Sequence, residues 1–457
     1  MTLQSKIKEV PGLQYVTDSM ELMSTAGRRR MLEQIFMTSP EDLRQEQILV
    51  SAMRSRLMNE SLTQAVTHLR HQLMQLHDIK TTLHNLQTHT VLDEVELFEI
   101  KNLAHISSHA RKALCELELD ELLGMPALDE VFSLLDPDHT GIPNFYIYDS
   151  YDIRLAPIRK QMKQADDSQM ADLLAQQNEI QNQVILSLGN KLYPHCQNLI
   201  KVMDQMAYID FTMARAELAI SWHLTEPIIG EQPALLGLVN PRLKQHNEEV
   251  GLRYQPVDIS LTPGVTFITG ANMAGKTVLL KSVGVAQLMF QFGFPTPANN
   301  AVMKPVDDVV FCIGDDQNEM NGLSSFASEI TRISEVISRS KTENLLVLID
   351  EPARTTNPIE GKALVQSIAS ILKDRNSTTL ITTHYSQLGI DCRRLRVRGF
   401  VEKLVDTPLT AYNINKFIDY SLVPDNSDEV PQEALRIAEM LECEPEMIAQ
   451  ARKYLQS

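Results

Sequence analysis

The sequence predicts a multidomain chain in which an all-α part is followed by an α/β part and then by a terminal pair of helices. Up to Trp222, glycines are few and apolar residues recur at helical spacing, whereas after Pro227 short β-rich segments alternate with helical ones. With 457 residues, 43% of them hydrophobic, the chain is long enough for about three structural units with cores of their own. We therefore expect domains over residues 1–226, 227–425 and 426–457.

The charge and hydrophobicity of the sequence indicate which kinds of partner to expect. The chain has 42 Lys and Arg against 59 Asp and Glu, a formal charge of −17, which argues against generic affinity for nucleic acid, because such binding needs clustered basic side chains. The dense basic cluster Arg28-Arg29-Arg30 is interpreted as a solvated helix end, with a phosphate site as the alternative. The sequence lacks a signal-peptide-like start and any apolar run of about 18 residues, so we expect a cytoplasmic protein with no membrane partner.

The helical part is predicted to carry an arm. A long pattern begins near Ile153, passes through a polar stretch around residues 166–190 and returns as LIKVMDQMAYIDFTMARAELAISW. Two long helices joined at their far ends predict an antiparallel arm over residues 153–220. Earlier in the chain, residues 136–141 (DPDHTG) are similar to a calcium loop but lack the acid at position twelve, so a turn between helices is expected.

Residues 270–277 (GANMAGKT) fit the pattern GxxxxGK[ST] between a predicted strand, VTFIT, and a predicted helix, TVLLKSVGVAQLM. Gly270 and Gly275 let backbone N–H groups turn inward around phosphates. Lys276 is expected to neutralise the β and γ oxygens, and the Thr277 hydroxyl to bind Mg²⁺. The segment therefore predicts a site for a nucleotide triphosphate with magnesium.

Three further polar residues end the next predicted strands of the same sheet. The apolar segment 345–349 delivers Asp350 and Glu351 at its carboxyl end, where ligands of open α/β sheets bind. We expect Asp350 to hold Mg²⁺ and Glu351 to polarise the attacking water, the alternative being that the two acids cap a turn. His384 ends the strand TTLITTH at the same edge and is expected to sense the γ-phosphate, unless it is an ordinary structural histidine.

From Pro241 to Ser457 the order and spacing of these segments closely resemble the ATPase domain of the MutS mismatch-repair family. The phosphate loop retains Asn272 and Met273 of the family pattern, but Ala271 replaces its usual Pro and Ala274 a Gly. The matching segments are TGANMAGKT, GLSSFASEI, DEPARTTNPIEG and the pair His384-Tyr385, beside TGPNMGGKS, GRSTFMVEM, DEIGRGTSTYDG and THY in the family.

The resemblance implies an ABC-type ATPase that works as a dimer, with a second copy or a homologous MutS-like chain as partner and the terminal helical pair at the dimer contact. Ser324 is then expected to reach the γ-phosphate bound to the other subunit; the alternative is that Ser324 and Ser325 merely cap a helix. Asn272 and Met273 become nucleotide-binding residues. Tyr254 lies where the family has an adenine-stacking aromatic side chain.

The helical half resembles the MutS core and lever, and we expect no counterpart of the mismatch-reading domain, the DNA-gripping clamp or a nuclease-like domain. This layout resembles the truncated MutS-like ATPases associated with adenosylcobalamin-dependent aminomutases, such as the lysine 5,6-aminomutase reactivating ATPase. Two hypotheses follow: ATP-driven closure moves the levers to remodel a protein client such as an aminomutase, or the chain acts on DNA in mismatch repair or recombination. A third, a nucleotide sensor without turnover, is disfavoured by the intact Lys276 and Glu351.

Overall fold

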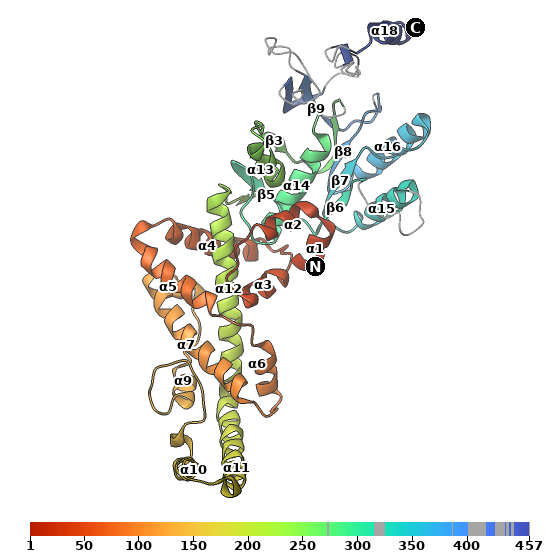
Figure 1. Cartoon of the computed structure of the whole chain (residues 1–457). Helices are drawn as coiled ribbons and strands as arrows, with labels where there is room; N and C mark the ends of the chain where they lie inside the picture. The colour runs from red at the N-terminus through yellow and green to blue at the C-terminus, as the bar shows by residue number, and fades with distance from the viewer. Residues whose placement is uncertain are drawn as a thin grey trace.

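The computed structural model describes residues 1–271, 274–314, 325–385, 387–400, 417–425, 435, 438–439 and 443–456. Helices fill the chain as far as Ser221, and two β-sheets with covering helices follow (Figure 1). The predicted fold class, an all-α part followed by an α/β part, is confirmed. Of the predicted terminal pair, the second helix is α18 (Pro445–Gln456), and the first falls mostly outside the described residues. Within those residues, no helix has both the length and the apolar character that crossing a membrane requires.

The long helix α12 (Cys196–Ser221) is the spine of the helical part, and helices α3, α4, α6 and α7 pack around it (Figure 1). Helix α11 (Asp167–Leu192) precedes α12 and is separated from it only by the 3-10 turn η3 (Tyr193–His195). In Figure 1 the two helices form one rod that points away from the sheets. The other elements of this part are α1 (Leu3–Glu9), α2 (Pro11–Asp18), α3 (Thr25–Leu32), α4 (Pro40–Leu57), η1 (Glu60–Leu62), α5 (Thr63–Met74), α6 (Lys80–Gln87), α7 (Glu94–Glu116), α8 (Asp120–Leu123), α9 (Asp129–Leu135), η2 (Asp149–Tyr151) and α10 (Leu155–Met162).

The arm differs from the predicted pair of long antiparallel helices. Its first helix is only α10, eight residues long, and the polar stretch that was expected to lie between the arm helices is itself α11. The polar stretch can be helical for two reasons. Its Gln, Ala, Leu and Met residues are good helix formers. A helix that packs against its neighbours on one side also needs only a narrow stripe of apolar residues. The buried stripe of α11 recurs every four residues and consists of Ile180, Val184, Leu188 and Leu192.

The main sheet of the α/β part has the strand order β10-β9-β4-β8-β7-β6. It is parallel from β9 to β6, and β10 returns antiparallel to β9. A second, four-stranded sheet with the order β1-β5-β2-β3 lies beside it. The strands are β1 (Ile228–Ile229), β2 (Ala234–Leu238), β3 (Val257–Ser260), β4 (Gly264–Thr269), β5 (Asn300–Met303), β6 (Asp308–Cys312), β7 (Leu345–Asp350), β8 (Thr378–Thr382), β9 (Arg393–Phe400) and β10 (Ile418–Pro424).

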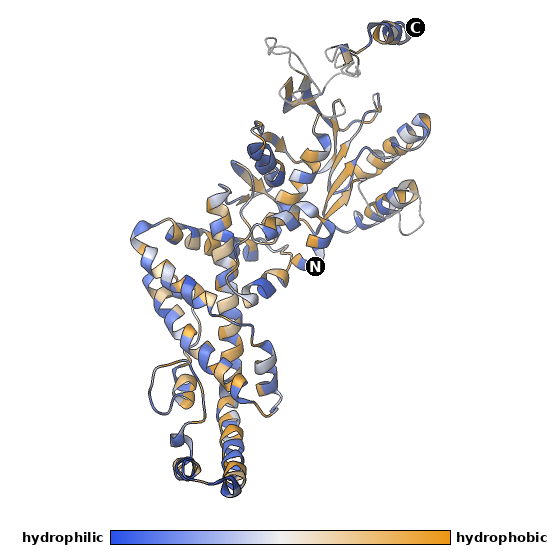
Figure 2. Ribbon diagram, in the orientation of Figure 1, coloured by the Kyte–Doolittle hydropathy of each residue, from blue (hydrophilic) through white to orange (hydrophobic). Residues whose placement is uncertain are grey.

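Helices cover both faces of the main sheet. Alternate residues of β7 divide between two cores: Leu346 and Leu348 join the core that contains α14, and Val347 and Ile349 join the core with α15 and α16. Figure 2 accordingly shows these central strands in the orange of apolar residues, as expected for parallel strands buried on both faces. The helices of this part are α13 (Pro241–Glu249), α14 (Lys276–Gln291), α15 (Ser325–Arg339) and α16 (Pro358–Leu372).

The beginning of the chain packs with the α/β part. Leu3, Leu13 and Val16, from α1 and α2, are buried in the same core as α14. A side chain larger than hydrogen at Gly12 would clash, because its Cβ would lie 2.7 Å from Cγ2 of Val285 in α14. The predicted boundary at residue 226 is therefore crossed by packing from the first helices of the chain.

Candidate nucleotide site

The predicted phosphate loop lies between β4 and α14, at the carboxyl edge of the main sheet. Gly270 has φ of +141° and Gly275, the N-cap of α14, has φ of +76°, a region that other residues rarely adopt. A Cβ at Gly275 would lie 3.0 Å from the ring of Tyr420, and one at Gly270 would lie 3.2 Å from Cβ of Val397. Conformation and crowding thus both require glycine at these two positions.

Lys276 is buried at the first turn of α14, with 5% of its side chain exposed. Its Nζ donates hydrogen bonds to the carbonyl oxygens of Gly270 (2.8 Å) and Ala271 (3.1 Å) and lies 3.3 Å from Oε1 of Glu351. The ammonium group therefore contacts oxygen acceptors at the positive end of a helix dipole. Phosphate oxygens are stronger acceptors of the same kind, so this cradle fits the charged end of a nucleotide.

Asp350 is held beside the hydroxyl of Thr277. Oγ1 of Thr277 donates to Oδ2 of Asp350 (2.7 Å), and Oγ1 of Thr382 donates to Oδ1 (2.6 Å). The register of β7 and β8 pairs Asp350 directly with Thr382. Mg²⁺ prefers hard oxygen ligands and usually takes only one or two from the protein, so a carboxylate next to a hydroxyl at a phosphate loop fits that ion.

Glu351 stands on strained backbone that its neighbours hold in place. It has φ of +44° and Ala353 has φ of +61°, conformations that cost roughly 1–3 kcal/mol each for residues other than glycine. The Glu351 N–H donates to Oγ1 (2.9 Å) and to the carbonyl oxygen (3.2 Å) of Thr382, and the Ala353 N–H donates to Oε1 of Glu329 (3.3 Å). The turn directs the Glu351 carboxylate toward Lys276, at the phosphate end of the site.

Two of the other predicted residues make contacts of their own, and three lie outside the described residues. His384 is exposed at the end of β8, between β4 and β7, and its ring packs against Tyr385 with centroids 4.3 Å apart. The hydroxyl of Tyr254 accepts a hydrogen bond from the Asn240 N–H (2.8 Å), and burial raises the pKa of that phenol. The structure brings together Gly270, Gly275, Lys276, Thr277, Asp350 and Glu351, whereas Asn272, Met273 and Ser324 lie outside the described residues.

The part of the chain that contains this site is similar to a known protein family. Residues 266–457 match the family model described as MutS domain V. MutS domain V is an ABC-type ATPase domain, and this part of the chain is similar to it.

Two proteins that are similar to part of this chain carry the same name. Endonuclease MutS2 of Halothermothrix orenii is 35% identical over 219 residues, which are 47% of this chain and 26% of that protein. Endonuclease MutS2 of Symbiobacterium thermophilum is 30% identical over 296 residues, 63% of this chain and 35% of that protein. The chain thus spans 26% to 35% of the length of these two curated relatives.

Two residues beside this site were not predicted from the sequence. Thr382 ties Asp350 to the Glu351 backbone, but a threonine near the end of a strand carries no motif of its own. Tyr420 lies on β10 with its half-buried ring against Gly275. The pairing of β10 with β9 brings that ring to the phosphate loop, and the Tyr420 N–H donates to Oε1 of Gln255 (3.2 Å). Among the described residues, the ring of Tyr420 thus lies beside the phosphate loop, and Tyr254, the predicted adenine-contacting residue, bonds to Asn240.

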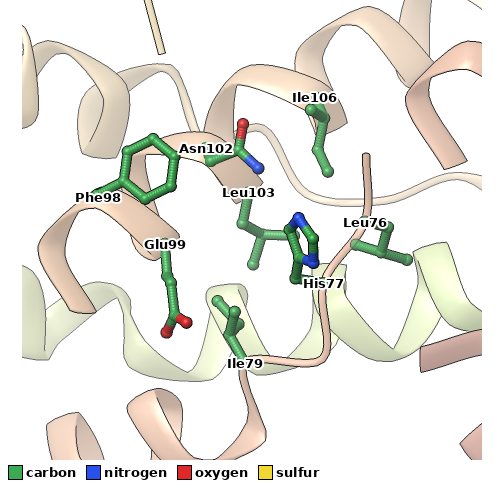
Figure 3. A pocket seen from close by; sticks show the side chains of 8 residues that line it. All are labelled: Leu76, His77, Ile79, Phe98, Glu99, Asn102, Leu103 and Ile106. Carbon is green, nitrogen blue, oxygen red and sulfur yellow. The ribbon is translucent and has the colours of Figure 1, made fainter. Parts of the chain in front are cut away.

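Two hollows elsewhere are weaker candidates for ligand sites. One, between α7 and the segment joining α5 to α6, measures about 10 Å³, room for a single water molecule (Figure 3). The other measures about 240 Å³ and lies between α1, β6 and α15. There Asp308 already pairs with Lys6 and Arg339, each at 3.0 Å. The lining of the small hollow consists of Leu76, His77, Ile79, Phe98, Glu99, Asn102, Leu103 and Ile106.

Two of the three arginines of the basic cluster in α3 make contacts within the helical part. Arg29 pairs with Asp78 (2.7 Å) and Glu33 (3.0 Å). Arg30 donates to Oε1 of Gln34 (2.7 Å), and its guanidinium lies 5.2 Å from the ring centroid of Tyr208. These contacts favour the interpretation of the cluster as a helix end over a phosphate site.

Proposed function

We propose that this chain binds and hydrolyses ATP with Mg²⁺ as a dimer, and that closure of the dimer moves its helical arm against a protein client. The observation that carries the proposal is the cluster of Lys276, Thr277, Asp350 and Glu351, joined by contacts of 2.7 to 3.3 Å at the edge of the sheet. Its residue types are those that phosphoryl transfer to water requires.

In this proposal each residue has a separate task. Lys276 holds the β and γ oxygens, while Thr277 and Asp350 hold Mg²⁺, whose charge offsets that developing on the phosphoryl oxygens. Glu351 orients the attacking water and accepts its proton. His384 senses the γ-phosphate, and Ser324 completes the site of the other subunit.

Packing supports a mechanical link from this site to the arm. The phosphate-loop helix α14 ends at a turn whose Gly293 carbonyl accepts a hydrogen bond from Nη1 of Arg215 (2.9 Å) in α12. Arg215 is fully buried and pairs with Glu46 (2.6 Å). A shift of α14 on ATP binding is therefore passed to the spine that continues into α11.

Light scattering and phosphate release test the ATPase proposal. We expect ATP with Mg²⁺ to double the molar mass of the purified chain, and Lys276→Ala to abolish both this change and turnover. Lys304→Ala is a matched control, since Lys304 follows β5 and pairs with Glu231, which follows β1. A wild-type chain that stays monomeric and releases no phosphate would rule the proposal out.

The client is the second part of the proposal. The charge of −17 and the internal pairing of Arg29 and Arg30 support a protein client, such as an adenosylcobalamin-dependent aminomutase. The name of the relatives, endonuclease, favours the alternative, DNA. With ATP present, a DNA-acting protein should lose about 10³-fold in affinity between 50 and 200 mM salt. A protein remodeller should show no DNA binding, and aminomutase should stimulate its ATP hydrolysis.

A further inference from the structure

Helix α15 begins in the GLSSFASEI segment and reaches the catalytic edge of its own subunit through Glu329. Oε1 of Glu329 accepts a hydrogen bond from the Ala353 N–H at 3.3 Å. Ala353 is fully buried and follows Glu351 by two residues. Burial raises the pKa of Glu329, and the Ala353 amide works in the opposite direction by favouring the carboxylate. The contact thus joins two elements of the site that are 24 residues apart.

The short turn from Glu351 to Ala353 is held from both sides. Thr382 accepts two hydrogen bonds from the Glu351 N–H, and Glu329 accepts one from the Ala353 N–H. Behind the turn, a Cβ at Gly361 of α16 would come within 3.1 Å of the Ala353 carbonyl oxygen. Left-handed backbone at two residues other than glycine persists only where the surroundings enforce it. Glu329 is the residue through which α15 helps to hold this backbone conformation.

We propose that Glu329 is a positioning residue that keeps the Glu351 carboxylate directed at the phosphate end of the site. It acts through the backbone of Ala353. Because α15 begins beside Ser324, a movement of this helix when subunits close would reach Glu351 through one hydrogen bond. The inference rests on the proposed ATPase function and assigns that site a further residue.

Steady-state ATP hydrolysis by the full-length chain tests this role. Glu329→Ala is expected to lower kcat about tenfold or more with KM for ATP within twofold, because a misplaced base weakens the transition state and leaves ground-state binding intact. Glu329→Gln keeps an oxygen acceptor for the Ala353 amide and should retain most of kcat. Glu335→Ala, an exposed glutamate on the same helix, is the matched control and should equal the wild type.

Three results would overturn the inference: a kcat of Glu329→Ala within twofold of the wild type, an effect confined to KM, or a Gln variant as impaired as the Ala variant. Thermal unfolding checks that each variant is folded. If Glu329→Ala is not folded, Glu329→Asp takes its place. Its carboxylate is one methylene farther from Ala353, so its kcat should fall below that of the wild type. A kcat equal to that of the wild type would count against a positioning role for Glu329. Absence of hydrolysis in the wild type would instead reject the proposed function.

Discussion

Two buried lysines, one in each half of the molecule, make similar contacts with different consequences. In the helical part, Lys101 is fully buried and its Nζ contacts Asp136 (3.0 Å), the Asn144 carbonyl (2.9 Å) and the Tyr148 hydroxyl (3.3 Å). In the α/β part, Lys276 contacts two loop carbonyls and Glu351 at 2.8 to 3.3 Å. Burial and pairing of a charge therefore do not by themselves identify a functional site.

The partners of the two lysines differ in where they come from. Asp136, Asn144 and Tyr148 belong to one connection after α9, and the Lys101 ammonium pins that connection to α7. The turn that is similar in sequence to a calcium loop is thus held by a protein cation. The partners of Lys276 lie at the carboxyl edge of a parallel sheet, beside a helix N-terminus, where a ligand can replace them.

The largest expected effect is a difference between the two lysines in how much each contributes to the free energy of unfolding. Lys101→Met leaves Asp136 buried without its cation and should lower the free energy of unfolding by about 3–5 kcal/mol. Lys276→Met should lower it less, because Glu351 keeps Arg354 within 3.8 Å and is partly exposed. Urea denaturation followed by circular dichroism measures both, and equal losses would break the comparison.

The rate of ATP hydrolysis should show the opposite order, with a large effect beside Lys276 and none beside Lys101. Glu351→Gln is expected to slow ATP hydrolysis about 100-fold, about 2.7 kcal/mol in the barrier, while ATP still binds. Asp136→Asn, the corresponding change beside Lys101, should leave the rate per folded molecule unchanged. Phosphate release together with binding of a fluorescent ATP analogue measures both. Hydrolysis by Glu351→Gln at the wild-type rate would remove Glu351 as the base.

A smaller effect is expected at the aromatic side chains. Tyr420→Ala should raise KM for ATP about fivefold, since the ring against Gly275 is placed to contact a bound nucleotide, a stacking contribution of about 1 kcal/mol. Tyr254→Ala serves as the control and should change KM less than twofold. The reverse order would support the predicted role of Tyr254 as the adenine-contacting residue and count against Tyr420.

The smallest expected effect is in the pH dependence of stability. Burial opposes the charge of Asp419, but hydrogen bonds from Gln255 and Ser421 and the nearby Arg398 outweigh it and lower the pKa of this carboxyl from 3.8 to about 2. Its contribution to stability is therefore complete above about pH 4 and is lost as the pH falls toward 2.

Asp419→Asn should cost about 1 kcal/mol at neutral pH, and the difference from the wild type should shrink between pH 4 and pH 2. Denaturant titrations at several pH values measure this difference. A difference that persists unchanged at pH 2 would mean that the charge of Asp419 contributes nothing.

The sequence alone determined the chemical groups of the site and the strands that carry them. Phosphate binding requires glycines, a lysine and a hydroxyl residue at fixed spacing, so residues 270–277 could be recognised without a structure. Asp350 and Glu351 end a short apolar segment rich in Leu, Val and Ile, which is typical of a buried strand. Parallel strands end at one edge, and this rule predicted that the two acids lie at the sheet edge that carries the phosphate loop.

Only the tertiary structure decided which distant residues surround those groups. Tyr420 reaches Gly275 through a returning strand, Glu329 reaches Ala353 from a neighbouring helix, and α1 and α2 join the core of the α/β part. That α11 and α12 follow each other with only a short turn between them likewise depends on tertiary packing, because neighbouring residues must cover the narrow apolar stripe of α11. Local spacing encodes backbone conformation and residue chemistry, whereas such contacts follow from which surfaces the whole chain buries together, and no short segment specifies that.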